Sequence, residues 1–274
     1  MAGGPFYSAL KWQIEAGADE AIGETPVDRF AEAPPSPPPP KVRPPAPPRQ
    51  AAPSAPRAAP SSPPAAPLPA ADPASQDAKA IAAGAKTLED IRAALEAFDG
   101  CPLKRTATNL VYTDGNPAAR IVLVGEAPGA EEDRRGLPFV GPAGRLLDRM
   151  LAAIGLDRSS VLITNTLFWR PPGNRNPTPA EAAACLPFVE RTIEIVDPKV
   201  LVMVGGTAAK TLLARPEGIM KLRGQWFEYS TPAMARPVPA MAIFHPAFLL
   251  RSPAQKRPTW RDLIEIRKHL EDSI

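Results

Sequence analysis

The sequence predicts an α/β fold built on a parallel sheet that helices cover on both faces. Beyond about residue 87, strand-like segments alternate with segments whose apolar residues recur at helical spacing. Each strand-like segment is a short, continuous apolar run rather than an alternation of apolar and polar residues. Such runs are typical of strands that are buried on both faces, as they are in parallel sheets joined by crossover helices.

Four core strands and one edge strand are expected. Each core strand is an apolar run that ends next to a loop rich in glycine, proline or polar residues. The core strands are expected at residues 120–124, 161–164, 199–204 and 241–244, and an edge hairpin strand at 225–229.

The helices between these strands begin with recognisable capping signals. A capping box pairs a Ser or Thr N-cap with an acidic or amide side chain three residues later, and proline is favoured at the first helical position. The expected helix starts are Thr87 with Asp90, Pro142, Thr178 with Pro179 and Glu181, Thr207, and about Thr259.

The N-terminal part of the chain has a different composition. The chain has 274 residues and 38 prolines, and residues 33–73 are almost entirely Pro, Ala and Ser with a few Arg and Lys. This composition cannot bury a core. Residues 5–22 predict a short helix, which we expect to dock on the main domain or to bind another protein. We therefore expect a helical segment at 1–32, a disordered linker at 33–80 and a globular domain at 81–274.

Charge and cysteine content place broad limits on function. The net charge of +3 is compatible with nucleic-acid binding but argues for it only weakly. The cationic residues of the linker favour a solvated spacer over an electrostatic tether to phosphates. Two cysteines make no disulfide framework, and we find neither a signal peptide nor an apolar stretch of membrane-spanning length. We expect a soluble, cytoplasmic protein.

The loops that follow the core strands are the expected place for chemistry, because ligands of open α/β sheets bind at the carboxyl ends of the strands. The first of these loops, residues 125–141, is rich in glycine, proline and acids. It lacks the spacing of phosphate-binding loops, and its acids would repel phosphate. A carboxylate that orients or activates a water fits this loop better. The alternative is a solvated acidic turn.

Three further residues follow strands or lie in these loops. Phe139 is either a core plug or an aromatic platform on which a planar base stacks. Asn165 has one acceptor and two donors and can recognise the imide edge of uracil, or it can simply cap a turn. His245 can donate to a developing oxyanion, although a single histidine is more often structural. His269, in the last helix among charged residues, is expected on the surface.

Three longer motifs contain Phe139, Asn165 and His245: GEAPGAEEDRRGLPFVGPAGRLLDRML (Gly125–Leu151), ITNTLFWRPPGNRNPTPAE (Ile163–Glu181) and FHPAFLLRSP (Phe244–Pro253). Together they resemble the type 4 uracil-DNA glycosylases, and the resemblance runs from about Phe98 to the C-terminus. It implies a three-layer α/β/α sandwich around a four-stranded parallel sheet.

The resemblance also implies how a base would be held. Gly125, Glu126 and Ala127 would line the base pocket. Phe139 would stack on uracil, and Asn165 would recognise its polar edge. Asn174, in the PPGNR loop, would help to shape the site.

Catalytic and DNA-distorting roles follow from the same resemblance. Glu132 would position or activate the attacking water, and His245 would stabilise the negative charge that builds on uracil O2. Glu126 would be a third catalytic residue. Enzymes that act on a base extrude it from the duplex. The wedge that enters the helix is expected at Leu249 or Leu250, together with Arg251.

One departure from the family pattern concerns its [4Fe–4S] cluster, which four cysteines hold. Cys101 and Cys185 match two of these ligands, but Phe98 and Trp169 occupy the other two positions. Two thiolates do not complete a Cys₄ site. We therefore expect that the protein has no cofactor, that the cluster is lost and that two aromatic side chains fill its place.

The hypothesis is a monomeric enzyme that hydrolyses the N-glycosidic bond of uracil in DNA and leaves an abasic site. The main alternative is a glycosylase-like DNA-binding protein that serves a polymerase or repair complex through its N-terminal helix. The presence of Glu132, Asn165 and His245 together argues against that alternative. A relative that traps DNA covalently through a histidine in the 169–177 loop is discounted, because this loop contains no histidine.

Overall fold

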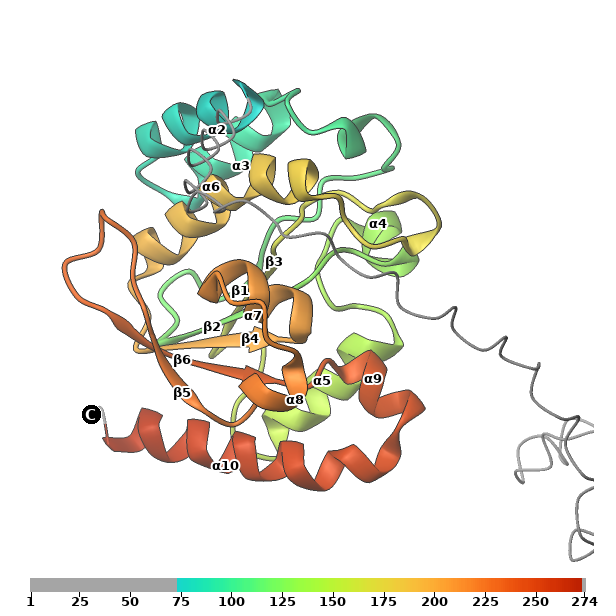
Figure 1. Cartoon of the computed structure of the whole chain (residues 1–274), viewed down its shortest axis with the longest axis vertical. Coiled ribbons are helices and arrows are strands. Elements are labelled where there is room, and N and C mark those ends of the chain that lie inside the picture. Colours follow the sequence, from blue (N-terminus) through green and yellow to red (C-terminus); the bar gives the residue numbers. More distant parts are fainter. Residues whose placement is uncertain (1–72, 273–274) are drawn as a thin grey trace, which may run out of the picture. The chain divides into compact units, whose positions relative to one another are not determined.

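The structure is a computed structural model that describes residues 73–272. Within this range the chain forms a six-stranded sheet with helices packed on it, so the predicted α/β class is confirmed (Figure 1). The helical segment expected at residues 1–32, and most of the linker expected at 33–80, lie outside the described residues. None of the described helices is both long and apolar enough to cross a membrane.

The sheet has the strand order β1-β3-β2-β4-β6-β5, and its four central strands run parallel. The strands are β1 (Asp114–Gly115), β2 (Ile121–Gly125), β3 (Leu162–Asn165), β4 (Val200–Val204), β5 (Trp226–Tyr229) and β6 (Val238–Ile243). The four expected core strands and the expected edge strand are thus confirmed. The sequence did not predict β1, which pairs antiparallel with β3 at the other edge and is too short to leave a pattern.

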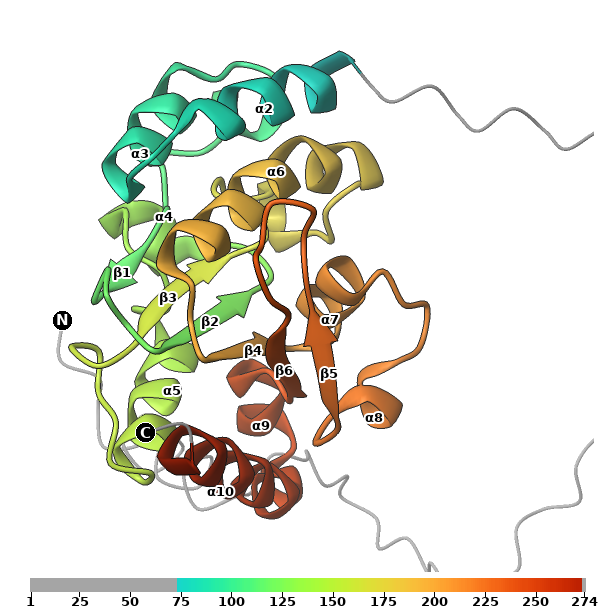
Figure 2. The same ribbon diagram turned by 90° about the vertical axis from the view of Figure 1, so that its left-hand side faces the viewer.

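Alternate residues of the central strands enter two hydrophobic cores, one on each face of the sheet. Val122 and Val124 face the first core, whereas Ile121 and Leu123 face the second. Figure 2 shows α2, α3 and α6 on one side of the sheet and α5 and α10 on the other. The first core is covered by α2 (Pro73–Gly84), α3 (Leu88–Ala97), α6 (Pro179–Val196), α7 (Gly206–Leu213) and the short α8 (Ile219–Leu222); the second is covered by α5 (Pro142–Ala152), α9 (Pro246–Arg251) and α10 (Lys256–Asp272).

Three of the five predicted helix starts hold at the atomic level, whereas α7 begins at Gly206 rather than Thr207 and α10 begins at Lys256 rather than about Thr259. Thr87 accepts from the backbone of Asp90 in a capping box, and Pro142 stands in the first turn of α5. Thr178 accepts from the backbone N–H of Glu181, whose carboxylate accepts in return from the Thr178 N–H at 2.8 Å. These caps fix where the helices begin, and with them the ends of the preceding loops.

Four of the described α-helices were not predicted, namely α2, α4 (Ala130–Arg135), α8 and α9. The expected linker boundary at residue 80 is wrong, because α2 begins at Pro73 and packs against α6 with Ala78 and Ala82 fully or almost fully buried. The short helix α4 interrupts the expected 125–141 loop. Alanine is common both in the linker and in α2, so composition does not separate them, but proline stops recurring in α2 and Ala has the highest helix propensity.

The parallel register brings the ends of the central strands to one edge of the sheet. Gly125 at the end of β2 lies opposite Asn165 at the end of β3. Past the end of β4, the N–H of Gly205 donates to the carbonyl of Ile243, the last residue of β6. The loops after β2, β3 and β6 therefore meet at this edge.

Candidate active site

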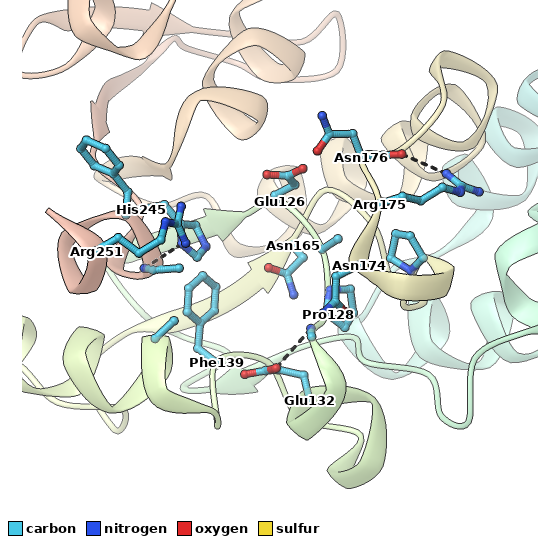
Figure 3. A pocket seen from close by; sticks show the side chains of 16 residues that line it. Glu126, Pro128, Glu132, Phe139, Asn165, Asn174, Arg175, Asn176, His245 and Arg251 are labelled. Carbon is cyan, nitrogen blue, oxygen red and sulfur yellow. Dashed lines mark hydrogen bonds between the residues drawn. The ribbon is translucent and has the colours of Figure 1, made fainter. Parts of the chain in front are cut away.

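A pocket of about 450 Å³ opens at the carboxyl edge of the sheet (Figure 3). The side chains that line it come from the loops after β2, β3 and β6, which are far apart in the sequence. The predicted site residues that it brings together are Glu126, Ala127, Glu132, Phe139, Asn165, Asn174, His245 and Arg251. Gly125 does not line the pocket but lies next to Phe139 and Asn165, which do, and the lining residues that sequence reasoning missed include Arg175, Asn176 and Phe248.

Glu132 holds the loop around the pocket through backbone hydrogen bonds. Its Oε1 accepts from the N–H groups of Val140 and Gly141 at 2.9 and 2.8 Å, and its Oε2 accepts from the N–H of Gly129 at 3.1 Å. An ionised carboxylate has about four acceptor positions. Three are in use, so one position on Oε2 is left for a water or a ligand.

The other acids of this loop differ from Glu132 in what they contact. Asp133 is buried and accepts from the backbone N–H groups of Thr108 and Asn109, so it ties α4 to an earlier loop. Glu131 forms an ion pair with Arg134 on the same helix. The interpretation as an acidic turn therefore fits Glu131 but not Glu132 or Asp133.

Phe139 forms one wall of the pocket and is 5 % exposed. Its ring stacks with that of His245, with centroids 5.6 Å apart and an interplanar angle of 29°. The ring lies close over Gly125, where a Cβ would stand 2.6 Å from ring atoms of Phe139 and 2.4 Å from Oδ1 of Asn165. A residue larger than glycine at position 125 would push both side chains out of the site.

Asn165 is the last residue of β3 and is 1 % exposed. Its amide faces the pocket, and no group in the part of the chain that the structure describes forms a hydrogen bond with this amide. A buried amide normally has hydrogen-bond partners. Its one acceptor and two donors are therefore available to a ligand in the pocket.

His245 follows β6 and is the N-cap of α9. Its Nδ1 accepts from the backbone N–H of Ala247 at 3.1 Å, so the proton of the neutral ring lies on Nε2. Burial, and then the charge of Arg251, lower the pKa of His245 to about 4, against a smaller opposite effect of Glu132. At neutral pH the ring is an uncharged donor.

The loop after β3 brings a second amide to the pocket. Asn174 adopts a left-handed backbone conformation with φ of 55°, and its Oδ1 accepts from Nε of Arg170 at 2.8 Å. Arg175 next to it forms a two-pronged ion pair with the buried Glu181 of α6, and the Arg175 guanidinium lowers the pKa of Glu181 to about 2. The loop is therefore anchored on the helix that follows it.

The structure separates the two leucines that were expected to act as the wedge. Leu249 is 1 % exposed and belongs to the second core, so its burial does not fit the prediction that it enters DNA. Leu250 is 42 % exposed, and Arg251 next to it lines the pocket. Neighbouring residues of a helix point to different faces, which the sequence alone did not resolve.

Comparison with known proteins agrees with this geometry. A family model described as the uracil DNA glycosylase superfamily matches residues 112–265. The chain belongs to the uracil DNA glycosylase superfamily. Its similar relatives include proteins named type-4 uracil-DNA glycosylase from Archaeoglobus fulgidus (42 % identical, 61 % of this chain and 85 % of the relative), Thermotoga maritima (44 %, 56 % and 77 %) and Sulfurisphaera tokodaii (37 %, 66 % and 84 %).

The resemblance to type 4 uracil-DNA glycosylases that the motifs predicted is thereby confirmed. The family match spans all three motifs, from just before β1 into α10. It includes every predicted pocket residue but begins after Phe98 and Cys101.

The cysteines of this uracil DNA glycosylase superfamily member do not fit a four-thiolate cluster. The Sγ atoms of Cys101 and Cys185 lie 3.9 Å apart, and both residues are buried. No group of three or more metal-ligating side chains occurs between residues 73 and 272, and the whole chain has only these two cysteines. Contact with Cys101 and burial raise the pKa of Cys185, which favours its thiol form.

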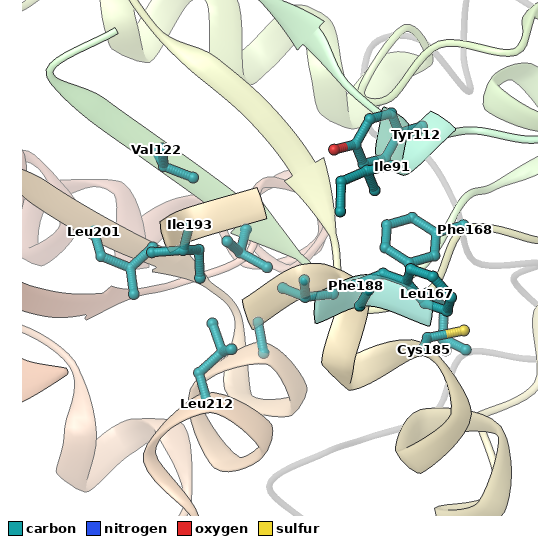
Figure 4. Close-up of a cluster of buried hydrophobic side chains, with 14 of the residues drawn as sticks. Ile91, Tyr112, Val122, Leu167, Phe168, Cys185, Phe188, Ile193, Leu201 and Leu212 are labelled. Carbon is teal, nitrogen blue, oxygen red and sulfur yellow. The ribbon is translucent and has the colours of Figure 1, made fainter. Parts of the chain in front are cut away.

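Aromatic rings occupy the core around this pair of thiols. Phe98, Phe168, Trp169 and Phe188 belong to the same buried cluster as the two cysteines. Edge-to-face contacts join Phe98 to Phe188 (5.2 Å), Phe188 to Phe168 (6.5 Å) and Phe168 to Trp169 (6.2 Å). Figure 4 shows Phe168, Phe188 and Cys185 together in this core. Residues expected to replace cluster ligands are thus part of a packed apolar core.

Proposed function

We propose that this chain hydrolyses the N-glycosidic bond of uracil in DNA and leaves an abasic site. The observation that carries the proposal is the pocket itself. It combines an aromatic wall (Phe139), an amide without a protein partner (Asn165) and a neutral imidazole donor (His245). These are the groups needed to bind a planar imide and to stabilise it as an anionic leaving group.

Uracil is recognised by stacking and by its imide edge. Phe139 supplies the stacking face. The Asn165 amide accepts from N3–H and donates to O4 of uracil, and in this orientation it does not match cytosine, which presents the opposite pattern at these positions. Asn174 closes the other side of the pocket, where its orientation is fixed by Arg170. Specificity of this kind depends on buried polar groups that stay unpaired when the wrong base enters.

His245 stabilises the leaving group. When the bond between the sugar and N1 breaks, the electron pair moves into the base and negative charge accumulates on O2. The Nε2–H of His245 donates to this oxygen. The neutral imidazole keeps its proton and stabilises the developing anion by hydrogen bonding. A single donor of this kind typically raises the rate by about 10²–10³-fold.

The attacking water is held by acids of the first loop. Glu132 keeps one acceptor position on Oε2 after its three backbone bonds. Because these bonds fix the carboxylate in place, Glu132 orients a water towards the sugar carbon. The carboxylate of Glu126 also lines the pocket, close to where the cationic sugar forms, and completes the catalytic group. The water oxygen bonds to the sugar carbon as the bond to N1 breaks, and the proton that the water loses ends on the departing uracil anion, which leaves as neutral uracil.

DNA is held and distorted at the α9 end of the pocket. Leu250 enters the duplex when the base leaves it, and Arg251 contacts the phosphate backbone beside it. Extruding a base costs a few kcal/mol of lost stacking and pairing, which an inserted side chain offsets. We further propose that the protein is a cytoplasmic monomer that does not associate with membranes. In this proposal residues 1–32 bind a protein partner.

The protein carries out this reaction without an iron–sulfur cluster. Two thiols and a chain of aromatic rings support this proposal, because aromatic side chains cannot ligate iron. Burial of Phe98 and Trp169 offers packing in place of metal–thiolate bonds. No catalytic step depends on the cluster position.

The test is excision by the purified full-length chain. Oligonucleotides that contain uracil opposite guanine, opposite adenine or in a single strand are incubated with the protein, and abasic sites are cleaved with alkali. We expect cleavage only at uracil. Intact oligonucleotides that are nevertheless bound tightly would favour the alternative function, a glycosylase-like accessory of a polymerase or repair complex.

A further inference from the structure

The backbone of Phe139 adopts a conformation that aromatic residues rarely take. Its φ is +53°, in the left-handed region. Residues in this region persist when surrounding contacts fix them, and they are frequent at functional sites. Because the Phe139 ring is a wall of the base pocket, whatever fixes this backbone also fixes the plane on which a base stacks.

One side chain outside the pocket holds this backbone. Arg158, in the loop before β3, donates from Nη2 to the carbonyl of Phe139 and from Nη1 to the carbonyl of Pro138, the latter at 3.2 Å. Arg158 does not line the pocket. Its contact with the site is through the two carbonyls of the Pro138–Phe139 segment.

Arg158 is itself fixed by two carboxylates from different elements. Its Nε donates to Asp148 of α5 at 2.9 Å, and its Nη1 pairs with Asp114 of β1. The side chain is only 27 % exposed. The planar guanidinium presents five N–H donors in a fixed fork, so it can bond two carboxylates and two carbonyls together, whereas a lysine ammonium cannot.

The neighbouring groups complete a clamp on Phe139. On its C-terminal side, Glu132 accepts from the N–H groups of Val140 and Gly141. At Gly144 of α5, an added Cβ would stand 1.6 Å from the Phe139 carbonyl oxygen, so α5 packs directly against this peptide. Arg158 is thus the cation that turns both carbonyls towards β1 and α5 and leaves the ring facing His245.

We infer that Arg158 is a positioning residue for base recognition: it sets the Phe139 ring for stacking on uracil without touching the substrate. The inference rests on the proposed uracil excision. It predicts that loss of Arg158 weakens uracil recognition, because the Phe139 ring is no longer held for stacking. Binding of DNA that lacks the base should be affected only slightly.

The experiment is a double-mutant cycle with Arg158→Met and Phe139→Ala, alone and combined. Single-turnover excision rates, inhibition by free uracil, and affinity for DNA that carries a tetrahydrofuran abasic analogue are measured for each. Removal of one base–aromatic stack typically costs roughly 5- to 150-fold, from about 1–3 kcal/mol per base. We expect Arg158→Met to lower the rate and the uracil affinity at least fivefold, and to cost less than twofold more in the Phe139→Ala background.

Arg191→Met is the matched control. Arg191 on α6 is 26 % exposed, donates from Nε to the carbonyl of Ala85 at 2.9 Å and pairs with Glu194, so it resembles Arg158 in burial and bonding but lies outside the pocket. We expect its excision rate to stay within twofold of wild type. If Arg158→Met does not fold, Arg158→Lys takes its place in the cycle, with a smaller loss expected because the charge is kept.

The outcomes separate the two proposals. If the wild-type chain does not excise uracil, the proposed function itself fails. If it does, additive losses of Arg158→Met and Phe139→Ala, or an equal loss of abasic-DNA affinity and uracil affinity, overturn the positioning role and make Arg158 a general structural residue. Coupled losses confined to the rate and to uracil affinity support it.

Discussion

Replacing His245 with asparagine tests the most specific electrostatic feature of the site. Burial, followed by the charge of Arg251, lowers the pKa of His245 from 6.5 to about 4. In the unfolded chain the ring regains its ordinary pKa. Asparagine is a good N-cap, so His245→Asn can still accept from the backbone N–H of Ala247 while it removes the titrating ring.

The sign and size of the effect follow from this difference in pKa. Between pH 6.5 and 4 the unfolded chain binds a proton at His245 that the folded chain does not, so the free energy of unfolding falls as the pH falls. Above pH 6.5 neither state is protonated and the contribution vanishes. At 1.36 kcal/mol per pKa unit, the loss is about 2 kcal/mol at pH 5 and approaches about 3 kcal/mol near pH 4.

The assay compares urea unfolding of wild type and His245→Asn at pH 8 and pH 5. Other acidic groups titrate in both proteins, so only the change in their difference reports on His245. We expect wild type to lose about 2 kcal/mol more than the variant, and its excision rate to show no histidine ionisation between pH 5 and 8. Parallel pH profiles, or a ring pKa near 6.5 by NMR, would refute the argument that His245 is a buried neutral donor.

The remaining predictions concern recognition, the cluster and the domain boundary. Asn165→Asp should lower the single-turnover rate about 10²-fold or more, because it puts a charge at the imide edge. The control Asn116→Asp, in a turn outside the pocket, should leave the rate unchanged. Equal rates for both variants would contradict the role of Asn165. Anaerobically purified protein should be colourless, and about four irons per chain would contradict the loss of the cluster. Deletion of residues 1–72 should leave the rate unchanged, whereas deletion of 1–86 removes α2 and should lower the Tm; an unchanged Tm in the second case would show that α2 contributes no packing.

The sequence predicted the parts of the fold that depend on local pattern. Apolar runs located the central strands, and capping boxes located α3 and α6. Because parallel strands gather their carboxyl ends, the sequence also predicted that Glu132, Asn165 and His245 lie in one pocket. These inferences need only periodicity, capping chemistry and topology.

Features that depend on the approach of distant segments escaped prediction. The three N–H groups that Glu132 binds come from both ends of a folded loop, and the carbonyls that Arg158 binds lie 19 and 20 residues before it. Nothing in the composition marks either contact. The same holds for Leu249 and Leu250, since only the packing of α9 decides which of the two is buried.

The aromatic core around the cysteines helps to hold the loop that carries Asn174. Trp169, 3 % exposed, anchors the start of the loop that carries Asn174, and the ion pair of Arg175 with Glu181 anchors its end on α6. The three edge-to-face contacts of this core each contribute about 0.5–1.5 kcal/mol beyond area burial, so together they supply a few kcal/mol to the same segments that a cluster would join. Because both anchors are side chains of this chain, the geometry of Asn174 depends on packing and one ion pair, and we expect the pocket to form in iron-free protein.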